Sequence, residues 1–373
     1  MSKFHPLRIA ALARETRDAI ALTFEVPEPL RDAFRFVQGQ HLTLRADIGG
    51  EDVRRSYSIC SAVQDDCLRV AVKRAPGGVF SAWANERLQA GQVIEVMPPM
   101  GHFNVPLDPA QANHYVGFAA GSGITPLLSI VKTTLAAEPK SRFTLFYGNR
   151  SSAAVMFREE LADLKDRYLE RLSLHFLMSR EPQEVELYNG RIDAQRVRQF
   201  GGKLFQPLEV SEYFVCGPGD MIEQVTSTLR DLGVESARVH AEHFTVATAE
   251  TPGQRPALEA PSSTAAPAPA SRAAPAAAAG SAEVSVLMDG RRRSFNMRME
   301  DETVLDAAAR AGVELPFSCR AGVCSTCRTK VVSGEVEMAQ NYALEDWELE
   351  QGYVLACQAH CKSPTLELDY DEK

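Results

Sequence analysis

Four cysteines near the C-terminus have the spacing of ligands to an iron–sulfur cluster. Cys319, Cys324 and Cys327 form the pattern Cys-x4-Cys-x2-Cys, and Cys357 follows further along the chain. This is the spacing of a plant-type 2Fe-2S cluster, and the small residues between the cysteines allow a tight loop whose backbone N–H groups can point at sulfur. A structural zinc site usually takes two cysteine pairs of similar short spacing, which this pattern lacks. The cysteines therefore predict single-electron chemistry.

A glycine pair stands where an apolar strand pattern changes into a helical one. Gly121 and Gly123 belong to the run GSGITP. Gly121 is the last residue of the apolar run 115–121, and a helical segment follows Gly123. Glycines let a backbone approach a pyrophosphate closely, and a helix N-terminus supplies free N–H groups and a positive dipole. Thr125 is a suitable N-cap there, with Pro126 as the first helical residue. The strand-to-helix context favours a nucleotide-binding turn.

Two further motifs contain groups that could contact a cofactor. Cys216 begins a Cys-Gly-Pro turn at the end of another apolar run, and ligands of open α/β sheets bind at the carboxyl ends of strands. Arg55 and Tyr57 alternate onto one face of a strand, so the guanidinium could hold a phosphate while the ring covers a flat cofactor. A purely structural turn and an ordinary exposed strand are the open alternatives.

The elements that must position these residues follow three patterns. The first hundred residues contain short alternating apolar and polar runs separated by Gly, Pro and Asp, which is typical of an antiparallel β-barrel. Continuous apolar runs then alternate with helical segments as far as residue 233, which predicts a parallel sheet covered on both faces. After residue 283, a hairpin signal at Asp289-Gly290 precedes a helix with Asp301 as its expected N-cap, which suits a small α+β fold.

These patterns predict a multidomain chain of three folded parts and a linker. We expect the β-barrel in residues 1–106, the α/β domain in residues 107–248 and the α+β domain in residues 283–373. Residues 249–282 are dominated by Ala and Pro, a composition that cannot form a core, and are expected to be the linker. No apolar run is long enough to span a bilayer and the N-terminus lacks an apolar signal core, so a cytoplasmic protein without a membrane anchor is expected.

The charge of the chain is concentrated at its C-terminal end. The net charge is −9, and residues 283–373, with seventeen Asp and Glu and ten Lys and Arg, contribute −7 of it. This acidity argues against a nucleic-acid partner, which would need a basic face. It suits docking to a basic patch on a redox partner, and an acidic surface that only keeps the protein soluble explains it equally well.

Taken together, the motifs resemble the ferredoxin–NADP reductase superfamily joined to a plant-type ferredoxin. The resemblance rests on Arg55-x-Tyr57-Ser58, the glycines of residues 77–81, the run GSGITP and Cys216-Gly217-Pro218. It covers nearly the whole chain except the linker. Longer segments, such as residues 4–27 and 340–359, are similar to the reductase subunits of multicomponent oxygenases.

The resemblance implies an FAD site in the barrel. Arg55 would contact the FAD pyrophosphate, Tyr57 would stack on the isoalloxazine, and Ser58 would hydrogen-bond near flavin N5. Gly78 and Ser81 would place backbone and hydroxyl donors at the phosphates.

The resemblance also implies contacts to the nicotinamide nucleotide and to iron. Cys216 would lie near the hydride path, and Glu242 and Phe244 are similar to a terminal stretch that closes over the flavin. Ser58, Cys216 and Glu242 are thus the expected catalytic residues. The expected nucleotide cradle consists of Gly121, Gly123 and Thr125. The expected iron ligands are Cys319, Cys324, Cys327 and Cys357.

The choice of nucleotide depends on the residues that follow two apolar runs. Arg150 follows the run 143–148, and Ser179 and Arg180 follow the run 172–178, with no acid directly at either end. Cations and hydroxyls suit the 2′-phosphate of NADPH, whereas NAD sites place an acid at the ribose. We therefore expect NADPH rather than NADH, with solvated loop residues as the open alternative.

The resemblance implies an electron path from NADPH through FAD and the 2Fe-2S cluster to a di-iron oxygenase, the one that epoxidises the aromatic ring of phenylacetyl-CoA in phenylacetate catabolism. Two alternatives stay open. One is a reductase of the same build that serves another oxygenase, for example a Rieske-type one. The other is a non-enzymatic 2Fe-2S redox module that has kept an inactive reductase part.

Overall fold

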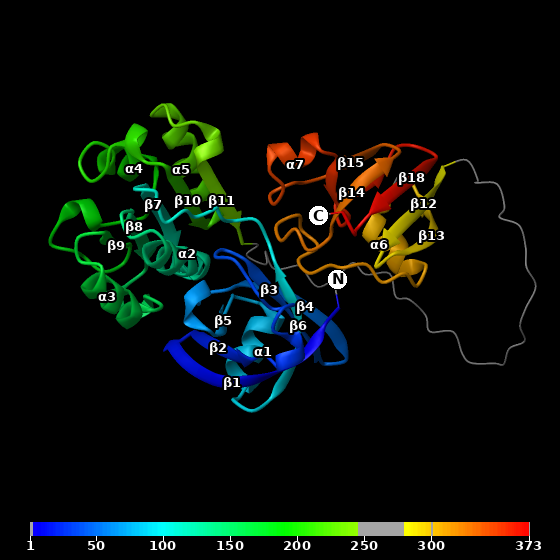
Figure 1. The fold of residues 1–373 in the computed structure, drawn as a ribbon, viewed down its shortest axis with the longest axis horizontal. Helices are drawn as coiled ribbons and strands as arrows, with labels where there is room; N and C mark the ends of the chain where they lie inside the picture. Colours follow the sequence, from blue (N-terminus) through cyan, green and yellow to red (C-terminus); the bar gives the residue numbers. More distant parts are fainter. Residues whose placement is uncertain (1–2, 245–279, 300, 373) are drawn as a thin grey trace, which may run out of the picture.

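The computed structural model describes residues 3–244, 280–299 and 301–372, which form three modules (Figure 1). We call residues 3–106 the barrel module, residues 107–244 the parallel-sheet module and residues 280–372 the cysteine module. Residues 249–279 of the predicted linker lie outside the described residues, and Ser281 already begins a strand.

The barrel module is a six-stranded antiparallel sheet in the order β4-β3-β6-β1-β2-β5. A bridge between Ile59 and Val70 joins its two edges and closes the barrel. Leu7 and Ile9 of β1 are buried, whereas Arg8 between them is exposed, as the period of two predicts. The elements are β1 His5–Thr16, β2 Ala19–Glu25, β3 His41–Ile48, β4 Glu51–Ser58, β5 Leu68–Lys73, α1 Val79–Arg87 and β6 Val93–Met100.

The parallel-sheet module has five parallel strands in the order β11-β10-β7-β8-β9. One face of the sheet packs on α2 and α3 through Leu127 and Leu161, and the other on α4 and α5 through Phe200 and Val225. Its strands are β7 His114–Ala120, β8 Arg142–Asn149, β9 Leu172–Met178, β10 Glu212–Gly217 and β11 Val239–His243. Its helices are α2 Ile124–Ala137, α3 Arg158–Arg167, α4 Ala194–Phe200 and α5 Gly219–Asp231.

The cysteine module combines a five-stranded sheet, in the order β13-β12-β18-β14-β16, with two helices and a two-stranded ribbon of β15 and β17. The predicted hairpin at Asp289-Gly290 joins β12 to β13. The predicted N-cap is wrong: α6 starts after Thr303, whose hydroxyl accepts a hydrogen bond from the Asp306 N–H, and not after Asp301. Its elements are β12 Ser281–Met288, β13 Arg291–Arg298, α6 Val304–Arg310, β14 Arg328–Ser333, β15 Val336–Met338, α7 Asp346–Glu350, β16 Tyr353–Leu355, β17 Ala359–Cys361 and β18 Thr365–Asp369.

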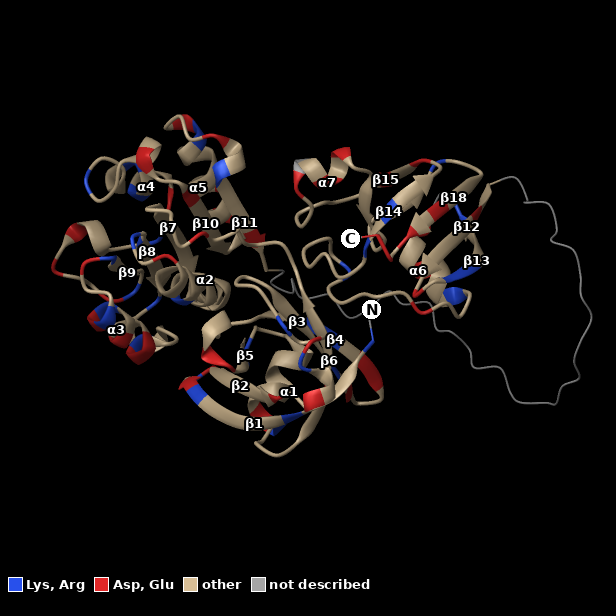
Figure 2. Cartoon of the chain, viewed as in Figure 1, with Lys and Arg blue, Asp and Glu red and all other residues tan. Residues whose placement is uncertain are grey.

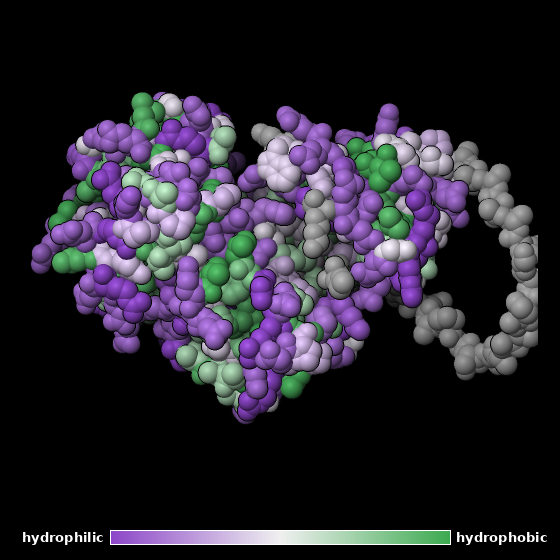
Figure 3. Space-filling model, in the orientation of Figure 1, coloured by the Kyte–Doolittle hydropathy of each residue, from purple (hydrophilic) through white to green (hydrophobic). Residues whose placement is uncertain are grey.

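The other two modules extend from the barrel module and leave a hollow between them, which the space-filling view shows (Figure 3). Acidic residues mark α7 and the strand ends of the cysteine module, whereas β13 is basic (Figure 2). Within the described residues, no helix has the length and apolar character needed to cross a membrane. The predicted fold class, an antiparallel barrel, a parallel α/β sheet and an α+β domain in one chain, is confirmed.

Candidate cofactor and electron-transfer site

Strand β4 presents a free cation and an aromatic ring at the edge of the barrel module. Arg55 is exposed, and its guanidinium bonds only to the carbonyl oxygen of Arg54, at 2.7 Å, with no acidic partner among the described residues. The Tyr57 ring lies 5.6 Å from the Phe80 ring of α1. An unpaired guanidinium beside a packed ring suits a cofactor that joins a pyrophosphate to a flat ring system.

The turn before α1 is too tight for a side chain at its glycine. A Cβ on Gly78 would lie 2.5 Å from Ser81 Oγ. That hydroxyl accepts a hydrogen bond from the Ala75 N–H at 3.0 Å and donates one to the Gly78 carbonyl at 3.3 Å. No side chain caps α1, so its first N–H groups are available to an anion such as a phosphate.

The GSGITP turn differs from its prediction in one respect. Helix α2 begins at Ile124, so Thr125 lies inside the helix and is not the N-cap. Thr125 is 2% exposed and donates a hydrogen bond to the Ser122 carbonyl at 3.0 Å, which stabilises the turn. The difference arises because Gly121–Gly123 form a short 3-10 turn between strand and helix.

The two glycines of this turn serve different purposes. Gly121 has a φ of +55° and open space where a Cβ would stand, so a ligand could approach it. A Cβ on Gly123 would lie 2.1 Å from the Cys216 carbonyl oxygen. Gly123 is therefore needed for packing of the turn against the end of β10, where Cys216 lies.

The three predicted catalytic residues come together from three strands. Ser58 of β4 donates a hydrogen bond to Glu242 Oε2 of β11 at 3.1 Å, and Cys216 Sγ of β10 lies 3.9 Å from the same oxygen. Burial raises the pKa of Glu242 to about 8, which keeps this carboxyl protonated at neutral pH. Phe244 follows β11 and packs against the core of the parallel-sheet module.

The segments after β8 and β9 run side by side and carry two cations. The Ser179 N–H bonds to the Asn149 carbonyl at 2.9 Å, and the Arg180 N–H bonds to the Arg150 carbonyl at 2.8 Å. Arg150 and Arg180 are both exposed and have no acidic partner among the described residues. Two adjacent unpaired guanidinium groups at this sheet edge can attract a phosphate.

An acid that the sequence analysis missed lies next to these cations. Glu181 accepts hydrogen bonds from the Ser152 N–H and hydroxyl, at 2.7 and 2.9 Å. Its side chain is therefore held by the loop after β8. Glu181 follows the last residue of β9 by three positions, and the sequence analysis considered only the residues directly at the strand end.

The four predicted iron ligands converge in one region of the cysteine module. The thiol of Cys319 lies within hydrogen-bonding reach of those of Cys324 and Cys357, and Cys357 within reach of Cys327. The Ala321 N–H points at Cys319 Sγ at 3.3 Å, as the N–H groups around a cluster do. Within the described residues no three His, Cys, Asp or Glu side chains gather closely enough for one metal ion. Each of the four thiols lies beside at least one other, and four thiols are the ligand set of a 2Fe-2S cluster, in which each iron takes two of them.

The cysteine loop lies against the same strand that carries Tyr57 and Ser58. Ser56 Oγ donates a hydrogen bond to Ser318 Oγ at 2.9 Å, and Ser318 directly precedes Cys319. The structure thus brings the predicted flavin strand and the predicted cluster loop into contact, although they are far apart in sequence.

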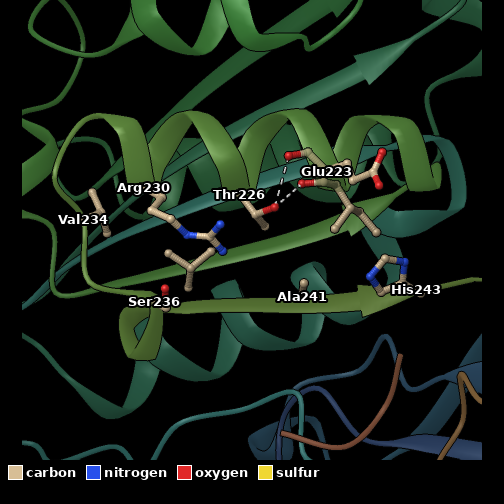
Figure 4. A pocket seen from close by; sticks show the side chains of 9 residues that line it. Glu223, Thr226, Arg230, Val234, Ser236, Ala241 and His243 are labelled. Carbon is tan, nitrogen blue, oxygen red and sulfur yellow. Dashed lines mark hydrogen bonds between the residues drawn. The ribbon is translucent and has the colours of Figure 1, made fainter. Parts of the chain in front are cut away.

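A groove of about 260 Å³ lies between α5 and β11 (Figure 4). Glu223, Thr226, Arg230, Ser236 and His243 line it, and none of the predicted site residues does. We therefore do not assign the cofactors to this groove.

Three family models match the three modules. An oxidoreductase FAD-binding domain matches residues 6–105, an oxidoreductase NAD-binding domain residues 118–227, and a 2Fe-2S iron-sulfur cluster binding domain residues 286–362. The chain is 43% identical to one of the subunits of the 1,2-phenylacetyl-CoA epoxidase of Escherichia coli (strain K12), over 100% of this chain and 99% of that protein. The chain belongs to this family of modular oxidoreductases.

A second curated relative and a solved structure also align along nearly the whole chain. The ferredoxin reductase component of 3-ketosteroid-9-alpha-monooxygenase from Rhodococcus rhodochrous is 34% identical, over 98% of this chain and 96% of that protein. The solved structure of phthalate dioxygenase reductase covers 98% of each chain with a TM-score of 0.58 and 24% identity, which shows the shared fold. This oxidoreductase passes electrons from a nicotinamide nucleotide through FAD to a 2Fe-2S cluster, so the alternative of a non-enzymatic redox module is wrong.

Proposed function

We propose that this oxidoreductase takes its electrons from NADPH and delivers them to a di-iron oxygenase that epoxidises the ring of phenylacetyl-CoA. The observation that carries the proposal is the 43% identity, over the full length of both chains, to a protein that is itself part of a 1,2-phenylacetyl-CoA epoxidase. FAD, when bound, accepts a hydride as two electrons and releases them singly, which the iron–sulfur cluster requires. The chain's own residues bind and orient the cofactors and exclude water.

The barrel module supplies the proposed FAD contacts. Arg55 would hold the pyrophosphate with its unpaired guanidinium, and the first N–H groups of α1, which no side chain caps, would bind the phosphates. Ser81 supports that turn, because its hydroxyl is bonded within it. Tyr57 would stack on the flavin ring. Ser58 would lie at the reacting edge of the ring.

The parallel-sheet module supplies the proposed hydride site. Gly121 leaves room for the nucleotide, while Gly123 and Thr125 keep the turn in shape. Because Glu242 is protonated at neutral pH, it places no negative charge beside a flavin ring that gains negative charge on reduction. Ser58 and Cys216 hold its carboxyl in place. Phe244 would close the site over the flavin. The proposed iron ligands are Cys319, Cys324, Cys327 and Cys357.

The proposed choice of NADPH predicts the effect of one substitution. Arg150→Glu should lower kcat/KM for NADPH about 10- to 100-fold, because a charge-assisted hydrogen bond to the 2′-phosphate is replaced by repulsion. The value for NADH should change little. Steady-state reduction of ferricyanide with each nucleotide measures both.

A matched control separates this effect from a general change of charge. Arg167→Glu alters an exposed arginine at the end of α3, away from the strand ends, and should leave both values near wild type. Equal losses for NADPH and NADH in Arg150→Glu would contradict the assignment of Arg150 to the 2′-phosphate.

The proposed acceptor is tested by reconstitution. The purified oxidoreductase, the di-iron oxygenase components of a phenylacetyl-CoA epoxidase, NADPH and oxygen should together convert phenylacetyl-CoA to its ring epoxide, measured by mass spectrometry. No product, despite a cluster that NADPH reduces, would contradict the proposed partner. A Rieske-type or other oxygenase is the second candidate, because a 34% identical relative serves 3-ketosteroid-9-alpha-monooxygenase.

A further inference from the structure

The cysteine module is held against the barrel module by a buried arginine. Arg54 of β4 is 6% exposed; its guanidinium lies 4.2 Å from the Phe317 ring and bonds to Glu314 at 3.1 Å. Arg45 approaches the same carboxylate at 3.9 Å. Two cations of the barrel module thus face one acid of the cysteine module, immediately before the cysteine loop.

A neutral contact lies next to this charged one. The hydrogen bond between Ser56 and Ser318 joins β4 to the residue before Cys319. This bond holds the start of the cysteine loop next to Tyr57 and Ser58, the residues of β4 assigned to the flavin site.

The parallel-sheet module holds the other end of the same face. His240 of β11 lies between Glu212 of its own module, at 2.9 Å, and Glu345 of the cysteine module, at 3.7 Å. The indole N–H of Trp347 donates to Glu345 at 2.8 Å and fixes its side chain. At the end of the groove in Figure 4, the His243 ring lies 5.2 Å from the ring of Tyr342.

These contacts have the character of a reversible interface. Acids of the cysteine module face cations of the other modules, and Glu314 and Glu345 remain partly exposed in the assembled protein. Ion pairs with an exposed partner stabilise weakly. Covalent connection through residues 245–279 raises the local concentration of the cysteine module, so weak contacts suffice to dock it.

The docked arrangement leaves little of the cysteine loop accessible. Among the proposed ligands, Cys324, Cys327 and Cys357 are buried and Cys319 is half-buried, and Ser318 beside Cys319 is 4% exposed. With FAD and the cluster bound, the face of the cysteine module that lies on β4 would be the one nearest the flavin strand. An external acceptor that approaches the same side of the cysteine module would find Phe317 and Ser318 in contact with Arg54 and Ser56, and Glu345 in contact with His240.

We propose that the face of the cysteine module formed by Glu314, Ser318, Tyr342 and Glu345 is a shared docking surface, which the other two modules of this chain and the external electron acceptor occupy in turn. The inference deepens the proposed function and rests on it, since it assumes an external protein acceptor. Each hydride from the nucleotide brings two electrons; docking lets each pass singly to a ferric iron of the cluster, and undocking lets it leave for the acceptor.

The first test locks the docked state in the holoprotein. Ser56→Cys with Ser318→Cys should form a disulfide, because the two hydroxyls are 2.9 Å apart, and non-reducing electrophoresis measures its yield. In the locked protein, stopped-flow reduction of the cluster by NADPH should proceed near the wild-type rate, whereas reduction of cytochrome c by the cluster should fall at least about tenfold. Reducing the disulfide, followed by desalting, should restore the wild-type rate of cytochrome c reduction.

The outcomes of this test are separable. The single variant Ser56→Cys is the control, and an unchanged cluster spectrum shows that the new cysteine at position 318 has not replaced a ligand. Absence of the disulfide with both thiols free, or locked protein that reduces cytochrome c at the rate of the unlocked one, would overturn the proposal.

The second test weakens docking without new cysteines. Glu314→Lys with Glu345→Lys should slow flavin-to-cluster transfer about tenfold and enlarge the radius of gyration in X-ray scattering, with flavin reduction unchanged. Glu283→Lys with Glu335→Lys makes the same change of charge on exposed acids outside the interface and is the control. A double variant that matches this control in both readouts would refute the docking surface. Neither test contains the oxygenase, so a failed reconstitution with the epoxidase leaves these results standing.

Discussion

Cys324→Ser should yield a protein without iron and inorganic sulfide that still oxidises NADPH with ferricyanide. A serine hydroxyl is a poor ligand for a cluster held by thiolates, so the loss of one of four ligands should remove the cluster. Ferricyanide takes electrons from the flavin, which lies in other modules, whereas cytochrome c reduction through the cluster should fall to background. Metal analysis, the visible spectrum and the two acceptor assays measure these effects.

The cysteine module offers a matched control for this substitution. Cys361 is fully buried in the same module, but its Sγ lies beside Ser363 and outside the four-cysteine pattern. Cys361→Ser should therefore retain iron, sulfide and cytochrome c reduction. Iron retained in Cys324→Ser would contradict its role as a ligand, and lost ferricyanide activity would mean that the flavin site depends on the cysteine loop.

The sequence predicted the cluster loop and the fold class because both depend on local patterns. Ligand spacing is a property of a few neighbouring residues, and the apolar run 172–178 coincides with β9. The two errors in helix capping, at Thr125 and Asp301, arose where a short turn or an additional capping residue separates the expected cap from the helix. Such differences of a few residues depend on hydrogen bonds that composition does not reveal.

The catalytic cluster could not be assembled from pattern alone. Ser58 and Glu242 are 184 positions apart, and no periodicity connects a serine of a barrel with a glutamate of a parallel sheet. Ser58 and Glu242 were predicted only from the resemblance to a family, and the structure joins them by a hydrogen bond. The contacts of Arg54 and His240 with the cysteine module were not predicted at all, since they depend on how separately folded modules meet.

Ser58→Ala should slow flavin reduction by NADPH about 100-fold with little change in nucleotide affinity. Loss of one oriented hydrogen-bond donor beside a reacting centre typically costs that much. Stopped-flow measurement at saturating NADPH isolates the step. Ser56→Ala is the control: it removes the neighbouring hydroxyl of β4, which contacts Ser318 and not Glu242, and should leave flavin reduction unchanged.

The pH profile distinguishes a role at the reacting centre from a merely structural one. The Glu242 carboxyl, with a pKa raised to about 8 by burial, is neutral at lower pH, and the Ser58 hydrogen bond opposes part of that rise. The hydride brings negative charge, so wild-type flavin reduction should fall as pH passes through about 8 and Glu242 ionises. Without the Ser58 hydroxyl the pKa of Glu242 rises further, and the fall should move to higher pH in Ser58→Ala. A variant that is slower at every pH by the same factor would show that Ser58 does not act through this carboxyl.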